Sequence, residues 1–229
     1  MKFVHIADVH FDCPFSSLSV RENLSDNRRL EQRNVFKKVI NYIKENHVRF
    51  LFISGDLYEN EYVRKSTMNY INDLFLEIPD TKIFIAPGNH DPYLKHSYYA
   101  EFEFSPNVYI FKGNFECKEL PDANIYGMGF QDFYCKDVNY SSINALQNGK
   151  PNFMVMHASL IGGGEENKEY NPVVESRLDA LNMDYIALGH IHKPYYDEIK
   201  NQKIVYPGSL ISLGFDEQGP HGMIVRRDK

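Results

Sequence analysis

The feature that most constrains this chain is a set of five short apolar runs, each followed directly by polar residues of the kind that bind metal ions. Runs of this length, bounded by Gly, Asn and Asp, are typical of buried strands. They cover residues 3–7, 50–54, 83–86, 153–156 and 185–188, and they lead into Asp8 and His10, Gly55 and Asp56, residues 88–91, His157, and residues 189–192. Because ligands in open α/β sheets lie at the carboxyl ends of the strands, the pattern predicts one pocket that gathers these side chains.

Helix-like segments separate the first three runs. Residues 30–46 have apolar side chains at the spacing of an amphipathic helix, and residues 66–76 repeat that pattern. Strands that alternate with helices favour βαβ units and a largely parallel sheet. The second half is richer in short strands, with helices expected at 141–147 and 173–181. We therefore predict an α/β protein, which some schemes would class as α+β, with two packed mixed sheets flanked by helices.

Length and composition narrow the class of protein. The chain has 229 residues, which fits one domain, and no apolar run reaches the roughly 20 residues of a membrane span. The first strand begins almost at residue 1, which predicts a cytoplasmic protein without a signal peptide or membrane partner. The net charge of −6 argues against a sequence-independent DNA binder, although bound cations would reverse the sign at the site itself.

The polar residues after the strands suit a metal centre. Asp8 and His10 are two positions apart and can reach the same ion, and His190 and His192 repeat that spacing. Asp56 could bridge two ions with its two oxygens. Imidazole, carboxylate and amide ligands together suit Mn, Fe or Zn. Taken alone, residues 88–91 would also fit an ordinary turn, and His190 and His192 could be unrelated surface or core histidines. The ordered set nevertheless predicts a site for two metal ions.

The order D-x-H, GD, GNHD, H and GHxH resembles that of the calcineurin-like metallophosphoesterase superfamily, and here it runs from Asp8 to His192. The strings ADVHFDCPF, SGDLYEN, ALGHIHKP, YPGSL and DEQGPHG are similar to the bacterial DNA-repair exonuclease branch of SbcD-like and YhaO-like proteins. The resemblance implies an αββα sandwich and the hydrolysis of phosphoesters.

The resemblance also implies roles for single residues. The first ion would be held by Asp8, His10, Asp56 and His192, and the second by Asp56, Asn89, His157 and His190. Mn²⁺ is the expected ion, with Fe, Zn or Ni as alternatives. His90 would face the substrate phosphate as the general acid, and Asp56 is counted with it as a catalytic residue. Asn89, His90 and Tyr93 are the expected substrate-binding residues.

Glu59 departs from the family pattern, in which His or Asp is usual three positions after the GD motif. Two interpretations of this residue stay open. In one, Glu59 pairs with His90, raises its pKa and belongs to the catalytic group. In the other, it is a solvated acid of the loop.

Three functions compete. The first is a phosphodiesterase or nuclease acting on DNA, and the second is an esterase for small nucleotides or other phosphoesters. A protein-interaction scaffold is the third, and the complete ligand set argues against it. Relatives in the DNA-repair branch usually carry a capping domain and a segment that binds an SbcC-like ATPase. We expect residues 1–229 to be a single catalytic domain without a separate capping domain, with such a partner only if the natural protein is longer.

Overall fold

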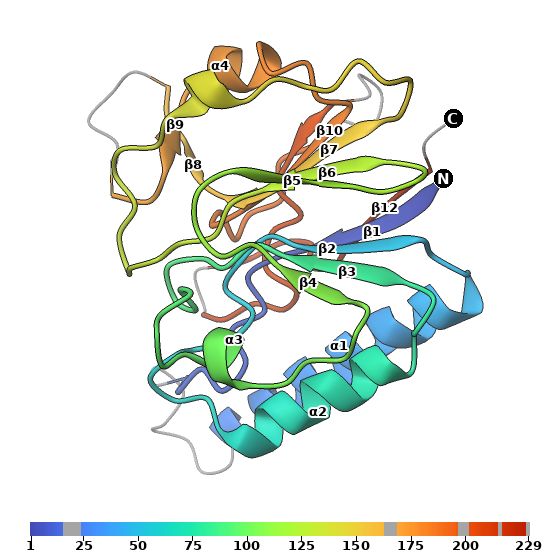
Figure 1. Cartoon of the computed structure of the whole chain (residues 1–229). Coiled ribbons are helices and arrows are strands. Elements are labelled where there is room, and N and C mark those ends of the chain that lie inside the picture. The colour runs from blue at the N-terminus through green and yellow to red at the C-terminus, as the bar shows by residue number, and fades with distance from the viewer. Residues whose placement is uncertain (16–23, 163–168, 197–201, 215–216, 228–229) are drawn as a thin grey trace.

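The computed structural model describes residues 1–15, 24–162, 169–196, 202–214 and 217–227, which form two packed five-stranded β-sheets with helices on their outer faces (Figure 1). The first sheet has the order β12-β1-β2-β3-β4. Its strands are β1 (Lys2–Ile6), β2 (Phe50–Ile53), β3 (Lys82–Ile85), β4 (Val108–Ile110) and β12 (Ile224–Arg227). Neighbours in this sheet are parallel except for β12, which pairs antiparallel with β1.

The second sheet has the order β11-β10-β7-β6-β5, and only β5 runs antiparallel to its neighbour. Its strands are β5 (Glu116–Glu119), β6 (Asn124–Gly127), β7 (Asn152–His157), β10 (Tyr185–Gly189) and β11 (Ile204–Val205). A separate parallel pair joins β8 (Ser159–Leu160) and β9 (Pro172–Val173). Both main sheets are thus mixed, as the sequence predicts, and the fold class is α/β.

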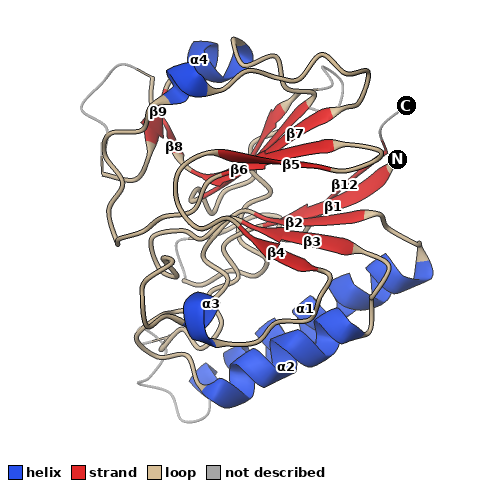
Figure 2. Cartoon of the chain, in the orientation of Figure 1, coloured by secondary structure: helices blue, strands red, loops and turns tan. Residues whose placement is uncertain are grey.

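The helices cover the outer faces of the two sheets, as the colouring by secondary structure makes clear (Figure 2). Helices α1 (Leu24–Glu45) and α2 (Lys65–Leu76) lie on the first sheet, and the short α4 (Glu175–Asp179) lies over the second. A one-turn helix, α3 (Tyr98–Glu101), precedes β4. None of the helices in the described ranges is long and apolar enough to cross a membrane.

Alternation along the strands divides the core into layers. In β2, Phe50 and Phe52 pack between the two sheets, while Leu51 and Ile53 face α1 and α2. Successive side chains of a strand point to opposite faces, so one strand serves two cores. The layer between the sheets is rich in aromatic rings, and the centroid of Phe52 lies 5.7 Å from that of Phe153 in β7. This packing fixes the two sheets against each other.

The helix predicted at residues 141–147 is wrong. The structure has a single 3₁₀ turn at Tyr140–Ser142, followed by irregular chain. Side chains satisfy the backbone groups that a helix would pair. The amide of Leu146 donates to the Tyr126 hydroxyl, that hydroxyl donates to the carbonyl of Asn144, and the Asn152 side chain donates to the carbonyl of Leu146. Such bonds offer the backbone an alternative to helix.

Register places the functional ends of the strands together. Ile6 of β1 lies beside Ile53 of β2, and Ile53 lies beside Ile85 of β3, so their following residues leave the first sheet at one edge. In the second sheet His157 of β7 lies beside Gly189 of β10. The Ser54 hydroxyl donates to the Ala187 carbonyl across the sheets at 2.9 Å. The carboxyl ends of both sheets therefore meet along a common edge.

Candidate metal centre

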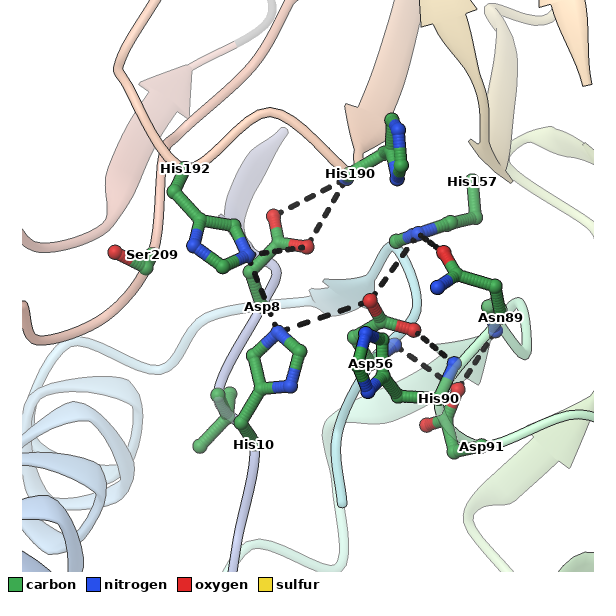
Figure 3. Close-up of polar contacts among 12 residues, drawn as sticks. Asp8, His10, Asp56, Asn89, His90, Asp91, His157, His190, His192 and Ser209 are labelled. Carbon is green, nitrogen blue, oxygen red and sulfur yellow. Dashed lines mark hydrogen bonds and ion pairs between the residues drawn. The ribbon is translucent and has the colours of Figure 1, made fainter. Parts of the chain in front are cut away.

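Seven predicted ligands gather at this edge, with Asp56 between His10 and His157 (Figure 3). The Nε2 atom of His10 lies 3.2 Å from Nε2 of His192 and 3.7 Å from Oδ2 of Asp56. The Nε2 atom of His157 lies 3.3 Å from the same Asp56 oxygen and 2.9 Å from Oδ1 of Asn89. The ligand atoms of Asp8, Asp56 and His157 form one close group, and those of Asp8, His10 and His192 form another.

The backbone at this site is held in an unusual conformation. Asp8, His10 and Asp56 have φ values of 51°, 52° and 52°, and His190 has a φ of 103°. Positive φ is uncommon for residues other than glycine, and such strain persists where the surrounding structure enforces it, often at functional sites. All four residues lie in the loops that follow strands. Their strained backbone directs their side chains toward the proposed metal centre.

Two glycines allow the strand ends to approach this closely. A Cβ atom on Gly55 would lie 2.3 Å from Nδ1 of His157. A Cβ atom on Gly189 would lie 1.8 Å from the carbonyl oxygen of Ser54. These contacts are far too short for non-bonded atoms, so any side chain here would push the strand ends apart.

Three histidines present Nε2 to the centre because their other ring nitrogen is already engaged. Nδ1 of His10 bonds Oε1 of Glu59 at 2.7 Å, and Nδ1 of His157 bonds the Ser54 carbonyl at 2.9 Å. Nδ1 of His192 bonds Oε1 of Glu217 at 2.5 Å. Metal-binding histidines usually donate their second N–H in this way, which fixes the tautomer and the ring orientation. The donor set and its supports fit divalent cations.

The electrostatics of the site suit cation binding. Burial, followed by the nearby His157, lowers the pKa of His190 to about 3, so its imidazole is neutral, the form that coordinates metal. Burial opposes ionisation of Asp56, but the nearby His157 outweighs it and holds the pKa of that carboxyl well below its usual range. Burial opposes protonation of His157, but Asp56 outweighs it and raises the pKa of His157 to about 9. The site therefore holds an ionised Asp56 beside a protonated His157 and a neutral His190 at neutral pH, and a bound cation would take the place of the His157 proton.

Glu59 connects a predicted ligand to the predicted general acid. Its Oε1 bonds Nδ1 of His10, and its Oε2 bonds Nδ1 of His90 at 2.8 Å. Burial disfavours protonated His90, but the hydrogen bond to Glu59 outweighs burial and raises the pKa of His90 to about 9. Burial also opposes ionisation of Glu59, yet its bonds to both histidines lower the pKa of Glu59 to about 2. The carboxylate is thus paired and is not a solvated loop acid.

Asp91 organises the loops beneath the site. Its carboxylate accepts hydrogen bonds from the amides of Asp56, Leu57 and Gly88, and from the Tyr99 hydroxyl at 2.6 Å. The side chain is completely buried. These bonds link the loop after β2 to the loop after β3, which fixes Asp56 relative to the segment that carries Asn89 and His90.

Tyr93 lies apart from the other predicted site residues. Its ring packs against the core between the first sheet and its helices, and the Lys112 ammonium lies 5.6 Å from the ring centroid. It does not appear among the described residues that line the cleft beside His90. A substrate contact of Tyr93 stays a prediction.

Sequence reasoning missed several residues around the centre. Glu217, which holds His192, also accepts a hydrogen bond from Ser209 at 3.3 Å and from the amide of Leu213 at 2.8 Å. The string DEQGPHG contains this acid, but no spacing links it to a histidine 25 positions earlier. A cleft of about 370 Å³ beside Asn89 and His90 is lined by Phe133, Tyr134 and Tyr170, none of which lies in a ligand motif.

Most of the chain matches known proteins, and these matches agree with the geometry of the site. The family model for calcineurin-like phosphoesterases matches residues 1–194, so the chain belongs to that family. Members of this family use a dinuclear metal centre. All seven predicted ligands, from Asp8 to His192, fall inside the matched segment, and Glu217 lies beyond it.

Two curated relatives and one solved structure are similar to the chain. The metallophosphoesterase YhaO of Bacillus subtilis (strain 168) is 24% identical, covering 97% of this chain and 56% of that protein. A subunit of the nuclease SbcCD from Staphylococcus epidermidis is 25% identical, covering 95% and 63%. The chain thus spans less than two thirds of either relative. The crystal structure of TT1561 of Thermus thermophilus matches with a TM-score of 0.50 at 10% identity, over 91% of this chain and 89% of that one, which shows a shared fold.

Proposed function

We propose that the protein is a dimetal-dependent phosphoester hydrolase that acts as a phosphodiesterase on DNA. The observation that carries the proposal is the convergence of three Nε2 atoms on two buried carboxylates, with each opposite ring nitrogen held by a hydrogen bond. Such preorganised donors hold cations without further rearrangement. Family membership supports the reaction class.

The proposed ligand assignment follows the two halves of the site. Asp8, His10 and His192 would hold one ion together with Asp56, and Asn89, His157 and His190 would hold the other, also with Asp56. Asp56 would serve both ions because its carboxylate lies within 3.7 Å of the Nε2 atoms of His10 and His157. We expect Mn²⁺, with Fe, Zn or Ni as alternatives, since mixed nitrogen and oxygen donors suit these ions.

Two divalent ions held by these residues would supply a nucleophile at neutral pH and would offset the charge on the phosphate oxygens. His90 would protonate the leaving oxygen, because its imidazole is exposed to the cleft while Glu59 holds its Nδ1. Glu59 would act through the histidines that it holds, keeping His90 protonated and His10 in its tautomer. Asn89 and His90 would also contact the substrate phosphate.

Two observations support DNA as the substrate. The relative from Staphylococcus epidermidis is named as part of a nuclease. A cleft of about 340 Å³ shares Tyr62 with the cleft beside His90 and is lined by three arginines, Arg29, Arg33 and Arg64, and by two carboxylates, Asp12 and Asp26. Asp26 pairs with Arg29 and Asp12 with Arg33, so a polyanion leaving the metal centre would meet a small excess of positive charge. We propose that residues 1–229 are one catalytic domain, and that an SbcC-like ATPase is the partner if the natural protein is longer.

A second candidate substrate is a small nucleotide. The cleft beside His90 contains two carboxylates, Glu59 and Glu61, and among its described lining residues none is Lys or Arg. A cleft with this charge favours a ligand with few phosphates, since each added phosphate would be repelled.

The experiment compares three substrates with added Mn²⁺: linear double-stranded DNA, bis-p-nitrophenyl phosphate and p-nitrophenyl phosphate. Asp56→Asn is the control, because it weakens both proposed ion sites. Loss of DNA cleavage in the control supports the nuclease. Activity on the small esters alone moves the substrate away from DNA. Absence of hydrolysis of all three by the metal-loaded protein would refute the proposed reaction.

A further inference from the structure

The cleft beside His90 carries a wall of aromatic rings, formed by Phe133, Tyr134 and Tyr170 and called the aromatic wall below. Phe133 is 38% exposed and Tyr134 is 54% exposed. Single exposed aromatic residues are common on protein surfaces. Adjacent exposed rings in a cleft that also contains Asn89 and His90 are different, because they leave apolar surface accessible next to the proposed reaction centre. The Lys136 ammonium lies 5.6 Å from the centroid of Tyr134, so a group that stacks on this ring would also meet a cation.

The rings of the wall are arranged for stacking. Tyr134 and Tyr170 lie with centroids 5.9 Å apart and an angle of 20° between their planes. Tyr170 in turn lies 4.9 Å from the ring of His190, a proposed metal ligand. The rings of Tyr134 and Tyr170 are nearly parallel, and Tyr170 is tilted by 43° against His190, so the aromatic wall lies in direct contact with the metal centre.

The wall is anchored to the metal centre by hydrogen bonds. The amide of Cys135 donates to the Glu169 carbonyl at 2.8 Å, which joins the segment of Phe133 and Tyr134 to the segment of Tyr170. Asn171, which follows Tyr170, is buried and donates from its side chain to the carbonyl of His157 at 3.0 Å. The rings thus keep a fixed position relative to a proposed ligand, and such rigidity limits the entropy lost on binding.

We infer that the aromatic wall is a nucleobase-binding subsite, which takes the base of the nucleotide whose phosphate lies at the metal centre. The inference rests on the proposed function for the position of that phosphate. The carboxylates of Glu59 and Glu61 in the cleft disfavour a second phosphate, whereas every base offers a π-face that an aromatic side chain can stack on. A base inside a duplex has both faces covered by its neighbours, so the subsite selects unpaired nucleotides.

The test uses the absence of tryptophan from the sequence. Tyr134→Trp places the only tryptophan of the protein in the wall, where its emission can be excited selectively over tyrosine, and keeps a stacking face. Titrations are made with Zn²⁺ present, because it is diamagnetic, and use thymidine 5′-monophosphate and 2-deoxyribose 5-phosphate as probes. The control is Leu76→Trp, at a 53% exposed position on the last residue of α2.

The nucleotide is expected to quench the emission of Tyr134→Trp at concentrations at which the sugar phosphate leaves it unchanged, and neither probe is expected to affect the control. By calorimetry, Tyr134→Leu should weaken nucleotide binding about tenfold, the size of one base stack, and leave sugar phosphate binding unchanged. Equal responses to both probes, or no response to the nucleotide, would overturn the subsite. Base-dependent quenching in a protein that hydrolyses no ester would instead refute the proposed function and keep the subsite.

Discussion

Glu217 accepts a hydrogen bond from Nδ1 of His192 at 2.5 Å, although the two residues lie in separate loops. The carboxylate is itself held by Ser209 and by the amide of Leu213. A carboxylate behind a ligand histidine fixes the ring and raises its basicity. We therefore expect the segment around Glu217, which lies outside the part matched by the family model, to support the proposed metal centre.

Replacing this carboxylate should weaken metal binding. We expect Glu217→Gln to lower Mn²⁺ affinity by about 10–100-fold, the range typical for such supporting groups, as measured by competition with a chelator. Glu101→Gln is a matched control, because Glu101 makes the same type of bond with the exposed His96 at 2.7 Å, away from the centre. Equal Mn²⁺ affinity in Glu217→Gln and in the parent protein would show that Glu217 does not support metal binding.

His90 should be needed for turnover and not for metal binding. Its side chain is 44% exposed and its Nδ1 is held by Glu59. We expect His90→Ala to retain both ions, measured as metal content per chain after gel filtration, and to lose about 10²–10⁴-fold in kcat, the contribution of a general acid. Loss of an ion from this variant would instead make His90 a ligand.

Glu59 should set the basic limb of the rate profile. A carboxylate beside imidazolium stabilises the protonated form, so Glu59 raises the pKa of His90 to about 9, and a general acid stops working as the pH rises through its pKa. Glu59→Gln removes that charge. The pKa should therefore fall toward 6.5, and activity should decline at a lower pH, measured as kcat against pH at saturating metal.

Glu61→Gln removes the same charge from another residue of this cleft and serves as the comparison. If the profile of kcat against pH shifts as far in Glu61→Gln as in Glu59→Gln, the shift reflects the overall charge of the cleft and not the hydrogen bond between Glu59 and His90.

Gly189 should be essential for the contact between the sheets. A Cβ atom there would lie 1.8 Å from the Ser54 carbonyl oxygen. Gly189→Ala must therefore push the end of β10 in one sheet away from the end of β2 in the other. We expect a loss of at least about 1–3 kcal/mol in the free energy of unfolding, as for overpacked cores, measured by urea denaturation.

Gly149→Ala provides the comparison. An alanine at the φ of 77° found at this position would carry backbone strain of about 1–2 kcal/mol, but its Cβ atom would meet nothing within 4 Å. A smaller loss in Gly189→Ala than in this variant would contradict the steric argument.

The sequence was sufficient to predict both sheets and the convergence of the seven side chains that we propose as ligands. Apolar runs define buried strands, and parallel strands end at the same edge, so ligands placed just after each run must meet. Asp8 and His157 are far apart in sequence, yet both positions follow from this rule.

Glu217 and the aromatic wall could not be predicted in this way. They lie on irregular segments whose positions depend on tertiary hydrogen bonds, such as those of Asn171 and Ser209, and no periodicity reports such bonds. For the same reason the helix predicted at 141–147 was wrong, because the Tyr126 hydroxyl and the Asn152 side chain take its backbone partners.

Anomalous diffraction from crystals of the Mn²⁺-loaded protein would show whether Asp56 bridges two metal ions. We expect two peaks about 3.5–4 Å apart, the spacing of two-metal sites, with Asp56 bound to both, Asp8, His10 and His192 on one side, and Asn89, His157 and His190 on the other. A single peak, or two peaks that do not share Asp56, would show that Asp56 is not a bridging ligand.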